Sequence, residues 1–142
     1  MTVNNELKKK ILLLLIADSR RSFRTIAKEL NISTTTVSRI VKELENTGII
    51  IGYCALVNWQ KVGYDSTLCL QITVASDANV DSVGSSVKNI SAIKQVFYTT
   101  GDATFSAYAV CKNTNDAAEL LEELRNISGV DRVVPHTILK TF

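Results

Sequence analysis

The chain has 142 residues, a formal net charge of +2, 46% hydrophobic and 21% charged residues. This composition is typical of a folded chain of one or two small domains and argues against intrinsic disorder. The longest apolar run, residues 11–17, is too short to cross a bilayer, and the N-terminus lacks a signal-peptide pattern. We therefore expect a cytoplasmic protein without a membrane partner.

Cysteine and histidine usage does not indicate a metal or disulfide site. Cys54, Cys69 and Cys111 stand far apart among apolar neighbours, without a CxxC motif, and His136 is the only histidine. Zinc needs clustered ligands, and an odd cysteine count argues against a disulfide scaffold. We expect three buried, unpaired cysteines, no metal and no cofactor.

Charge is divided unevenly along the chain. Residues 1–60 hold nine lysines and arginines against five acids, which gives +4, whereas residues 61–142 hold seven against nine, which gives −2. A basic N-terminal half fits a polyanionic partner such as DNA.

The N-terminal half predicts three helices. Residues 4–17 carry Leu7, Ile11, Leu14 and Leu15 at helical spacing, and a turn over residues 18–21 carries two arginines. Residues 22–48 then show two apolar stripes separated by a three-residue break, which is the pattern of a helix-turn-helix unit. The stripes comprise Phe23, Ile26, Ala27 and Leu30, then Val37, Ile40 or Val41, and Leu44.

Both helices of this unit carry terminal signals. Ser22 and Ser33 precede the two stripes as N-caps, and Gly48 follows the second as a C-terminal glycine. The outward N-terminal face of the second helix is rich in hydroxyls and cations, and it has no carboxylate before Glu43. Such a face suits a recognition helix in the DNA major groove, although the same periodicity fits a solvated helix of an ordinary bundle. The predicted DNA contacts are Arg20, Arg21, Ser33, Thr34, Thr35, Thr36, Ser38, Arg39 and Lys42.

The C-terminal half predicts a different architecture. Residues 48–57 are rich in β-branched side chains and read as a strand, so we expect domains at 1–50 and 66–142 joined by a β linker or hinge at 51–65. Beyond it we expect strands at 67–75, 93–100, 104–111 and 130–142, and helices at 81–89 and 115–126. The second of these helices is predicted to bury Ala118, Leu121 and Leu124, and Gly101-Asp102 to form a tight turn. The order is that of the ferredoxin-like βαββαβ unit, which makes the fold class α+β.

Several motifs together carry a family resemblance. They are Asp18-x-Arg20, Ser33-x-x-Thr36-Val37-x-Arg39-x-Val41-Lys42-x-Leu44-Glu45, Gly48-x-Ile50-x-Gly52-Tyr53-x-Ala55, Thr100-Gly101-Asp102, and the ending from Gly129-Val130 to Thr137. On these residues the chain resembles the Lrp/AsnC family of leucine-responsive, feast/famine transcriptional regulators. It departs from the family pattern at Thr34 and Ile40, where proline and a second arginine are frequent, and at Ala103-Thr104, where the hairpin often reads GDYD.

The resemblance implies a DNA-binding regulator. It implies a homodimer formed through the C-terminal sheet, further assembly to tetramers or octamers, and binding to a pseudo-palindromic double-stranded operator. It also implies a small-molecule effector, usually an amino acid, whose site would include Gly101, Asp102, Thr104 and Thr137.

Three other interpretations remain open at this point. One is an architectural DNA-binding protein of the same fold that needs no effector. Another is an enzyme resembling the haem-biosynthesis decarboxylases, but the C-terminal half has only His136, Arg125 and Arg132 to line a tetrapyrrole pocket, so we expect no enzyme. The third is RNA binding by the sheet, which would require exposed aromatic side chains.

Overall fold

The structure, a computed structural model, describes residues 2–141, with side chains from residue 5 onward. The backbone forms two compact units, Met1–Leu56 and Val57–Phe142. Their boundary falls within the predicted linker at residues 51–65. No helix in the described part of the chain is both long and apolar enough to span a membrane.

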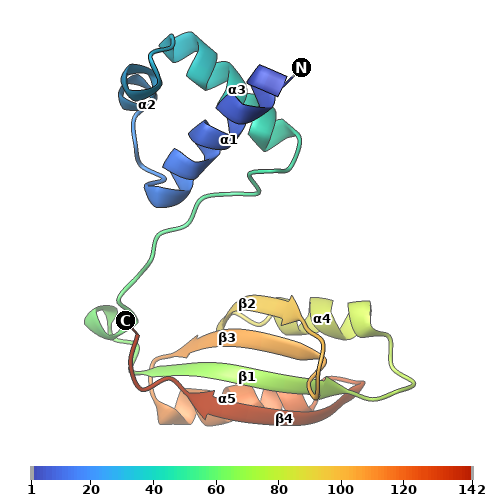
Figure 1. Cartoon of the computed structure of the whole chain (residues 1–142). Helices are drawn as coiled ribbons and strands as arrows, with labels where there is room; N and C mark the ends of the chain where they lie inside the picture. The colour runs from blue at the N-terminus through green and yellow to red at the C-terminus, as the bar shows by residue number, and fades with distance from the viewer. Residues whose placement is uncertain (1, 142) are drawn as a thin grey trace. The chain divides into compact units, whose positions relative to one another are not determined.

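The N-terminal unit contains three helices, α1 (Thr2–Ala17), α2 (Phe23–Leu30) and α3 (Thr34–Asn46) (Figure 1). Both predicted N-caps are confirmed: Ser22 Oγ accepts the Thr25 amide at 3.1 Å, and Ser33 Oγ accepts the Thr36 amide at 3.0 Å. Each cap satisfies an amide that the first helical turn leaves unpaired. Gly48 follows α3 with φ +71°, as predicted for a helix-ending glycine.

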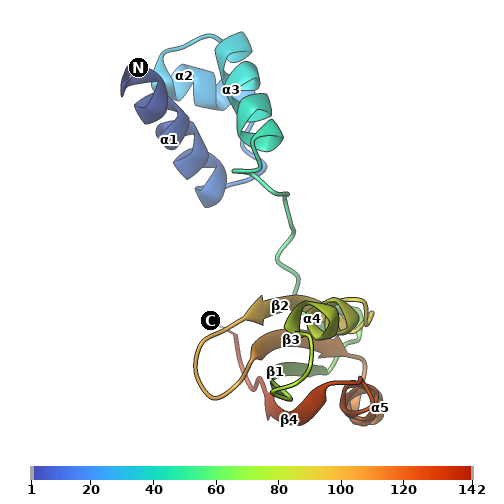
Figure 2. The same cartoon turned by 90° about the vertical axis from the view of Figure 1, so that its right-hand side faces the viewer.

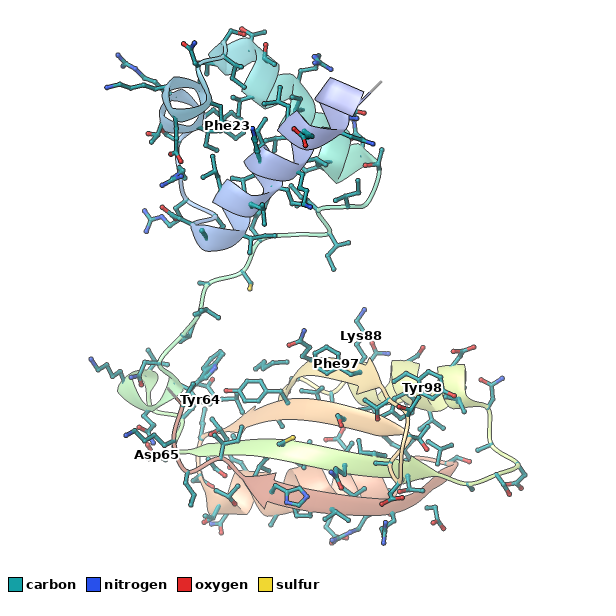
Figure 3. All side chains as sticks on the ribbon, viewed as in Figure 1. Phe23, Tyr64, Asp65, Lys88, Phe97 and Tyr98 are labelled. Carbon is teal, nitrogen blue, oxygen red and sulfur yellow. The ribbon has the colours of Figure 1, made fainter. Side chains whose placement is uncertain are left out.

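A single apolar cluster holds these helices together in the described structure, and it confirms the predicted stripes except at Phe23. Its buried members are Ile11, Leu15, Ile26, Ala27, Val37, Ile40, Val41 and Leu44. Phe23 is predicted to begin the buried stripe of α2, but its side chain is exposed (Figure 3). The cluster is small, so each of its members contributes a large share of the burial that stabilises this unit.

The predicted linker strand is absent. Residues 51–58 have no regular secondary structure, and Ile51 and Leu56 are 96% and 99% exposed. A segment rich in β-branched residues forms a strand only where a neighbouring strand satisfies its backbone, and no strand in the described part of the chain pairs with this segment. A short 3-10 helix, η1 (Trp59–Val62), follows.

The C-terminal unit contains β1 (Ser66–Val74), α4 (Val80–Lys88), β2 (Ile93–Tyr98), β3 (Phe105–Cys111), α5 (Thr114–Arg125) and β4 (Val130–Thr137). The strands form one antiparallel sheet in the order β2-β3-β1-β4, which confirms the βαββαβ prediction. Both helices cover the same face of the sheet (Figure 2). Among the described residues of this unit, no helix packs on the opposite face.

The core of this unit lies between the helices and the sheet. Leu68, Leu70 and Ile72 alternate into it from β1, as predicted. On α5 the predicted face is partly wrong, because Ala117, Leu120 and Leu124 are buried while Ala118 is exposed and Leu121 is only partly buried. The apolar residues at 117–118 and 120–121 are adjacent pairs, so helical periodicity fits either the face with 117 and 120 or the face with 118 and 121. Packing on the sheet selects the first of these faces.

Two of the three cysteines differ from expectation. Cys111 is buried, but Cys54 and Cys69 are exposed. Cys69 alternates with Leu68 and Leu70 along β1, so its side chain lies on the face that no helix covers. Cys54 belongs to the unpaired segment at residues 51–58.

Gly129 precedes β4 in a conformation that only glycine tolerates easily. Its φ is +90°, and an added Cβ would lie 2.7 Å from the Cβ of Ala78 and 3.0 Å from Val83 Cγ2. Gly129→Ala is therefore expected to lower the free energy of unfolding of the C-terminal unit by about 1–3 kcal/mol from overpacking, in addition to backbone strain.

Gly63→Ala is the matched control for Gly129→Ala. Gly63 has φ +85° but open space around its Cα, so that change adds backbone strain without the clash. Urea unfolding of both variants compares the two effects. Equal losses in both variants would contradict the proposed clash.

Candidate DNA-binding surface and effector loop

Helix α3 presents the predicted recognition face to solvent. Val37, Ile40, Val41 and Leu44 point into the core, which leaves the N-terminal outer face free of large apolar groups. Of the predicted contacts on this helix, Thr34, Thr35, Arg39 and Lys42 are exposed, and Thr36 and Ser38 are partly buried. Short hydroxyls and long cations on one face allow close approach to a groove and its phosphates.

Two predicted contacts, Ser33 and Thr36, already bond to one another. Their hydroxyls lie 2.7 Å apart, and Ser33 Oγ also accepts the Thr36 amide. Ser33 is therefore first of all a helix cap, and part of its bonding capacity is used within the helix start. Thr34 and Thr35 form no side-chain hydrogen bond in the described structure, so their hydroxyls are available to a ligand.

Arg39 is held only loosely. Its side chain is 61% exposed, and Nη1 lies 3.9 Å from Glu43 Oε2. Lys8 of α1 also pairs with Glu43, at the other carboxylate oxygen, Oε1. An exposed ion pair of this length contributes little, so the guanidinium remains free to form a bidentate contact with a base.

The two arginines of the turn before α2 differ in availability. Arg21 Nη1 lies 2.9 Å from Glu29 Oε2, so this cation is already paired. Arg20 is exposed; its backbone amide is bonded to Asp18 Oδ1 at 3.0 Å, while its guanidinium has no acidic partner in the described structure.

Two further cations, Arg24 and Lys28, lie one turn apart on α2 and are exposed, although they are not among the predicted contacts. Their i,i+4 spacing outside the apolar stripe was the available signal. In the part of the chain that the structure describes, neither Arg24 nor Lys28 has an acidic group within salt-bridge distance, and the same holds for Lys42. With Arg20 they form a set of unpaired cations on the helix-turn-helix unit.

The segment after α3 is bonded back to that helix. The Tyr53 hydroxyl donates a hydrogen bond to Glu45 Oε1 at 2.9 Å. Partial burial, followed by the bond to Glu45 and its negative charge, raises the pKa of Tyr53, so the hydroxyl remains a donor at neutral pH. This bond ties the start of the exposed segment to the C-terminal part of α3.

The predicted tight turn at Gly101-Asp102 is a wider loop over residues 99–104 between β2 and β3. It is closed by the Thr99 amide, which donates to the Thr104 carbonyl at 2.9 Å. Gly101 has φ +112° with open space around it, and Asp102 is exposed. The carboxylate of Asp102 has no partner in the described structure, whereas its backbone carbonyl accepts a bond from Thr73 Oγ1 at 3.4 Å.

Within one chain, Thr104 and Thr137 lie too far apart to belong to the same site. Thr104 Oγ1 accepts the Val74 amide at 3.0 Å, so its side chain braces the loop against β1. Thr137 pairs with Leu68 of β1, whereas the Thr104 amide donates to the carbonyl of Ile72 on the same strand. Leu68 and Ile72 are four residues apart. That separation corresponds to roughly 13 Å along the strand. One chain therefore brings Gly101, Asp102 and Thr104 together and leaves Thr137 apart from them.

Comparisons with known proteins agree with both units. Residues 4–51 match the model of the winged helix-turn-helix DNA-binding family, and residues 67–142 match the Lrp/AsnC ligand binding domain. The transcriptional regulator LrpA of Pyrococcus horikoshii is 31% identical over 137 residues, covering 96% of each chain. LrpA of Pyrococcus abyssi is 32% identical with the same coverage.

A solved structure extends the likeness in fold. The feast or famine regulatory protein of Mycobacterium tuberculosis, complexed with L-methionine, superposes with a TM-score of 0.86 at 23% identity, covering 96% of this chain and 92% of that chain. At this identity the likeness shows the shared fold. Because its two units match the two domains of these regulators, the chain belongs to the Lrp/AsnC family of ligand-modulated transcriptional regulators.

Proposed function

We propose that this regulator binds a pseudo-palindromic operator as a homodimer, with one α3 helix in the major groove at each half-site. The observation that carries this proposal is the outer face of α3, where Thr34, Thr35, Arg39 and Lys42 are exposed and the apolar residues are all turned inward. A two-fold dimer presents two such helices, which a two-fold operator matches. In this proposal the protein acts on DNA in the cytoplasm.

The uncovered face of the sheet supports dimerisation. Cys69 and Gln71 of β1 and Phe97 of β2 are exposed, and Phe97 is 49% exposed although it is a large aromatic residue (Figure 3). A sheet face without helices gains burial by packing on a second copy of itself. Tetramers or octamers of such dimers belong to the same proposal.

An amino acid is the proposed effector, bound at the 99–104 loop between copies of the chain. The loop combines the exposed backbone of Gly101, which has open space around it, with the carboxylate of Asp102, which has no partner in the described structure; these groups suit the carboxylate and ammonium groups of an amino acid. Since Thr137 lies apart from the loop in one chain, its inclusion in the site requires a second copy. The effector changes DNA affinity only if it binds one assembly state more tightly than another.

A gel-shift titration tests this function. The protein is mixed with DNA from upstream of its own gene, at fixed salt, with and without a pool of the proteinogenic amino acids. We expect a specific complex whose affinity or stoichiometry the pool changes. A specific complex that the pool leaves unchanged would favour the effector-independent regulator. If no specific complex forms, the protein is next used to select sites from a random DNA library, and failure to enrich any site would contradict specific DNA binding.

Gly101→Val is expected to abolish the response to the effector while leaving the N-terminal unit folded. A β-branched residue is strained at φ +112°, so the loop must change conformation. The measurement is the ratio of operator affinities with and without the active amino acid. Gly63→Val is the matched control because Gly63 also has a positive φ and open surroundings but lies outside the loop. A normal ratio and a normal assembly size in Gly101→Val would contradict this placement of the effector.

A further inference from the structure

We propose that a second pocket, at the opposite end of the sheet from the 99–104 loop, binds a free α-amino acid with an apolar side chain. The pocket has a volume of about 360 Å³ and lies where β3 ends and α5 packs on the sheet. Cys111 at its base pairs with Ser66 at the start of β1, whereas the loop bonds to Ile72 and Val74 near the end of that strand. This inference extends the proposed regulation by amino acids to a site within a single chain.

One wall of the pocket is acidic. Asp116, Glu119 and Glu123 line it from α5, spaced by three and four residues so that they share one face of the helix. In the described structure none of these carboxylates has a cation within salt-bridge distance. The neighbouring Glu122, by contrast, pairs with Arg125 at 2.9 Å and does not line the pocket.

Two lysines line the same pocket from the sheet. Lys112 follows β3 and has no carboxylate partner among the described residues, and Lys94 of β2 donates through Nζ to the Ser91 carbonyl at 2.7 Å. Charges of both signs act on Cys111, which also lines the pocket. Burial is the largest cause that raises the pKa of Cys111, the negative charge of Asp116 raises this pKa further, and the positive charge of Lys94 lowers it. Cations and carboxylates therefore lie around one cavity without pairing with each other.

The floor between these charges is apolar. Ile90, Ala92 and Leu120 contribute apolar side chains to it. Tyr64, which lies between η1 and β1, also lines the pocket (Figure 3). Small-molecule sites combine such a floor with a few convergent polar groups, and a volume of this order is sufficient for an amino acid.

A zwitterion fits this lining better than an ion of one sign. Its ammonium group would neutralise the α5 carboxylates, its carboxylate would pair with the lysines, and its side chain would cover the floor. A diamine would satisfy only the acidic wall and would add positive charge beside Lys94 and Lys112. The chemistry therefore selects an amino acid rather than a polyamine.

Trp59 provides a local signal for binding. It is the only tryptophan in the sequence. Its ring packs edge-on against the Tyr64 ring, with 5.5 Å between the two ring centroids, and Lys94 Nζ lies 5.7 Å from the centroid of the Trp59 ring. A ligand carboxylate that draws Lys94 away from the indole removes a cation from its face. The emission of Trp59 is therefore expected to change on binding.

The experiment titrates the full chain, without DNA, with each non-aromatic proteinogenic amino acid while Trp59 emission is recorded. We expect a saturable change with at least one apolar amino acid. The double variant Glu119→Gln/Glu123→Gln is expected to raise its Kd at least tenfold, and Lys112→Met is expected to weaken it as well. Glu122→Gln, on the same helix but outside the pocket, is the matched control and should leave the Kd unchanged.

Three results would overturn the pocket: no saturable change with any amino acid, an unchanged Kd in both pocket variants, or equal binding of putrescine or of the amino acid amide. Gly101→Val separates this proposal from the effector loop, because it should leave the Trp59 titration intact. If an amino acid changes DNA affinity without a Trp59 response, the pocket is wrong and the loop proposal stands. If Trp59 responds as predicted but DNA affinity does not change, the pocket stands and the proposed regulation is wrong.

Discussion

Arg39→Ala is expected to produce the largest loss of specific DNA binding of any single change on the surface of α3. The side chain is 61% exposed on the outer face of the helix and is held only by a long contact with Glu43. If it forms a bidentate bond with a guanine, its removal costs about 1–3 kcal/mol at each half-site. A two-fold operator uses the contact twice, so the loss on the full site should be about double that on one half-site.

The matched comparison for Arg39→Ala is Lys42→Ala on the same helix. Lys42 is exposed and, in the described structure, has no acidic partner, which suits a phosphate contact. Its loss should weaken binding to all sequences alike and reduce the salt dependence by about one unit of log–log slope per contact. Binding to the operator and to a scrambled duplex at several salt concentrations separates the two roles. If Arg39→Ala lowered affinity for both duplexes equally, base reading by Arg39 would be wrong.

Ile40→Ala is expected to unfold the N-terminal unit selectively. Ile40 is fully buried in a cluster with only seven other buried residues in the described part of the unit. A change from isoleucine to alanine in a core costs about 2–5 kcal/mol, which is a large fraction of the stability of a small domain. The C-terminal unit has its own apolar cluster and should remain folded.

Hydrogen exchange measured segment by segment checks this prediction for Ile40→Ala. Amides of α1, α2 and α3 should lose protection, while those of β1 and β3 keep it. Ile51→Ala, at a side chain that is 96% exposed, is the control and should change neither unit. Equal loss of protection in both units would show that they do not fold independently.

The helix-turn-helix unit could be predicted almost completely because its signals are local. Helical spacing of Val37, Ile40, Val41 and Leu44 identifies the buried face, and Ser22 and Ser33 mark helix starts through bonds to residues only three positions away. The alternation in β1 is local in the same sense. Where residues within one turn or one strand determine the structure, the sequence pattern is sufficient.

The remaining features depend on partners distant in sequence. Residues 51–58 have strand composition but no strand to pair with, and Cys69 is exposed because no helix covers its face of the sheet. The separation of Thr137 from Gly101 follows from strand register, which the order of elements alone does not specify. The pocket beside α5 combines residues from four parts of the chain, and single-sequence periodicity cannot assemble them.

The most direct test of the central claim is guanine methylation protection on an operator selected from random DNA. Major-groove binding by two α3 helices predicts two protected regions related by two-fold symmetry, with centres about one helical turn or a multiple of it apart. Arg39→Ala should lose protection at one guanine in each half-site and keep the rest. A single unpaired region of protection, or a pattern that Arg39→Ala leaves unchanged at concentrations giving equal occupancy, would contradict recognition of the operator by α3.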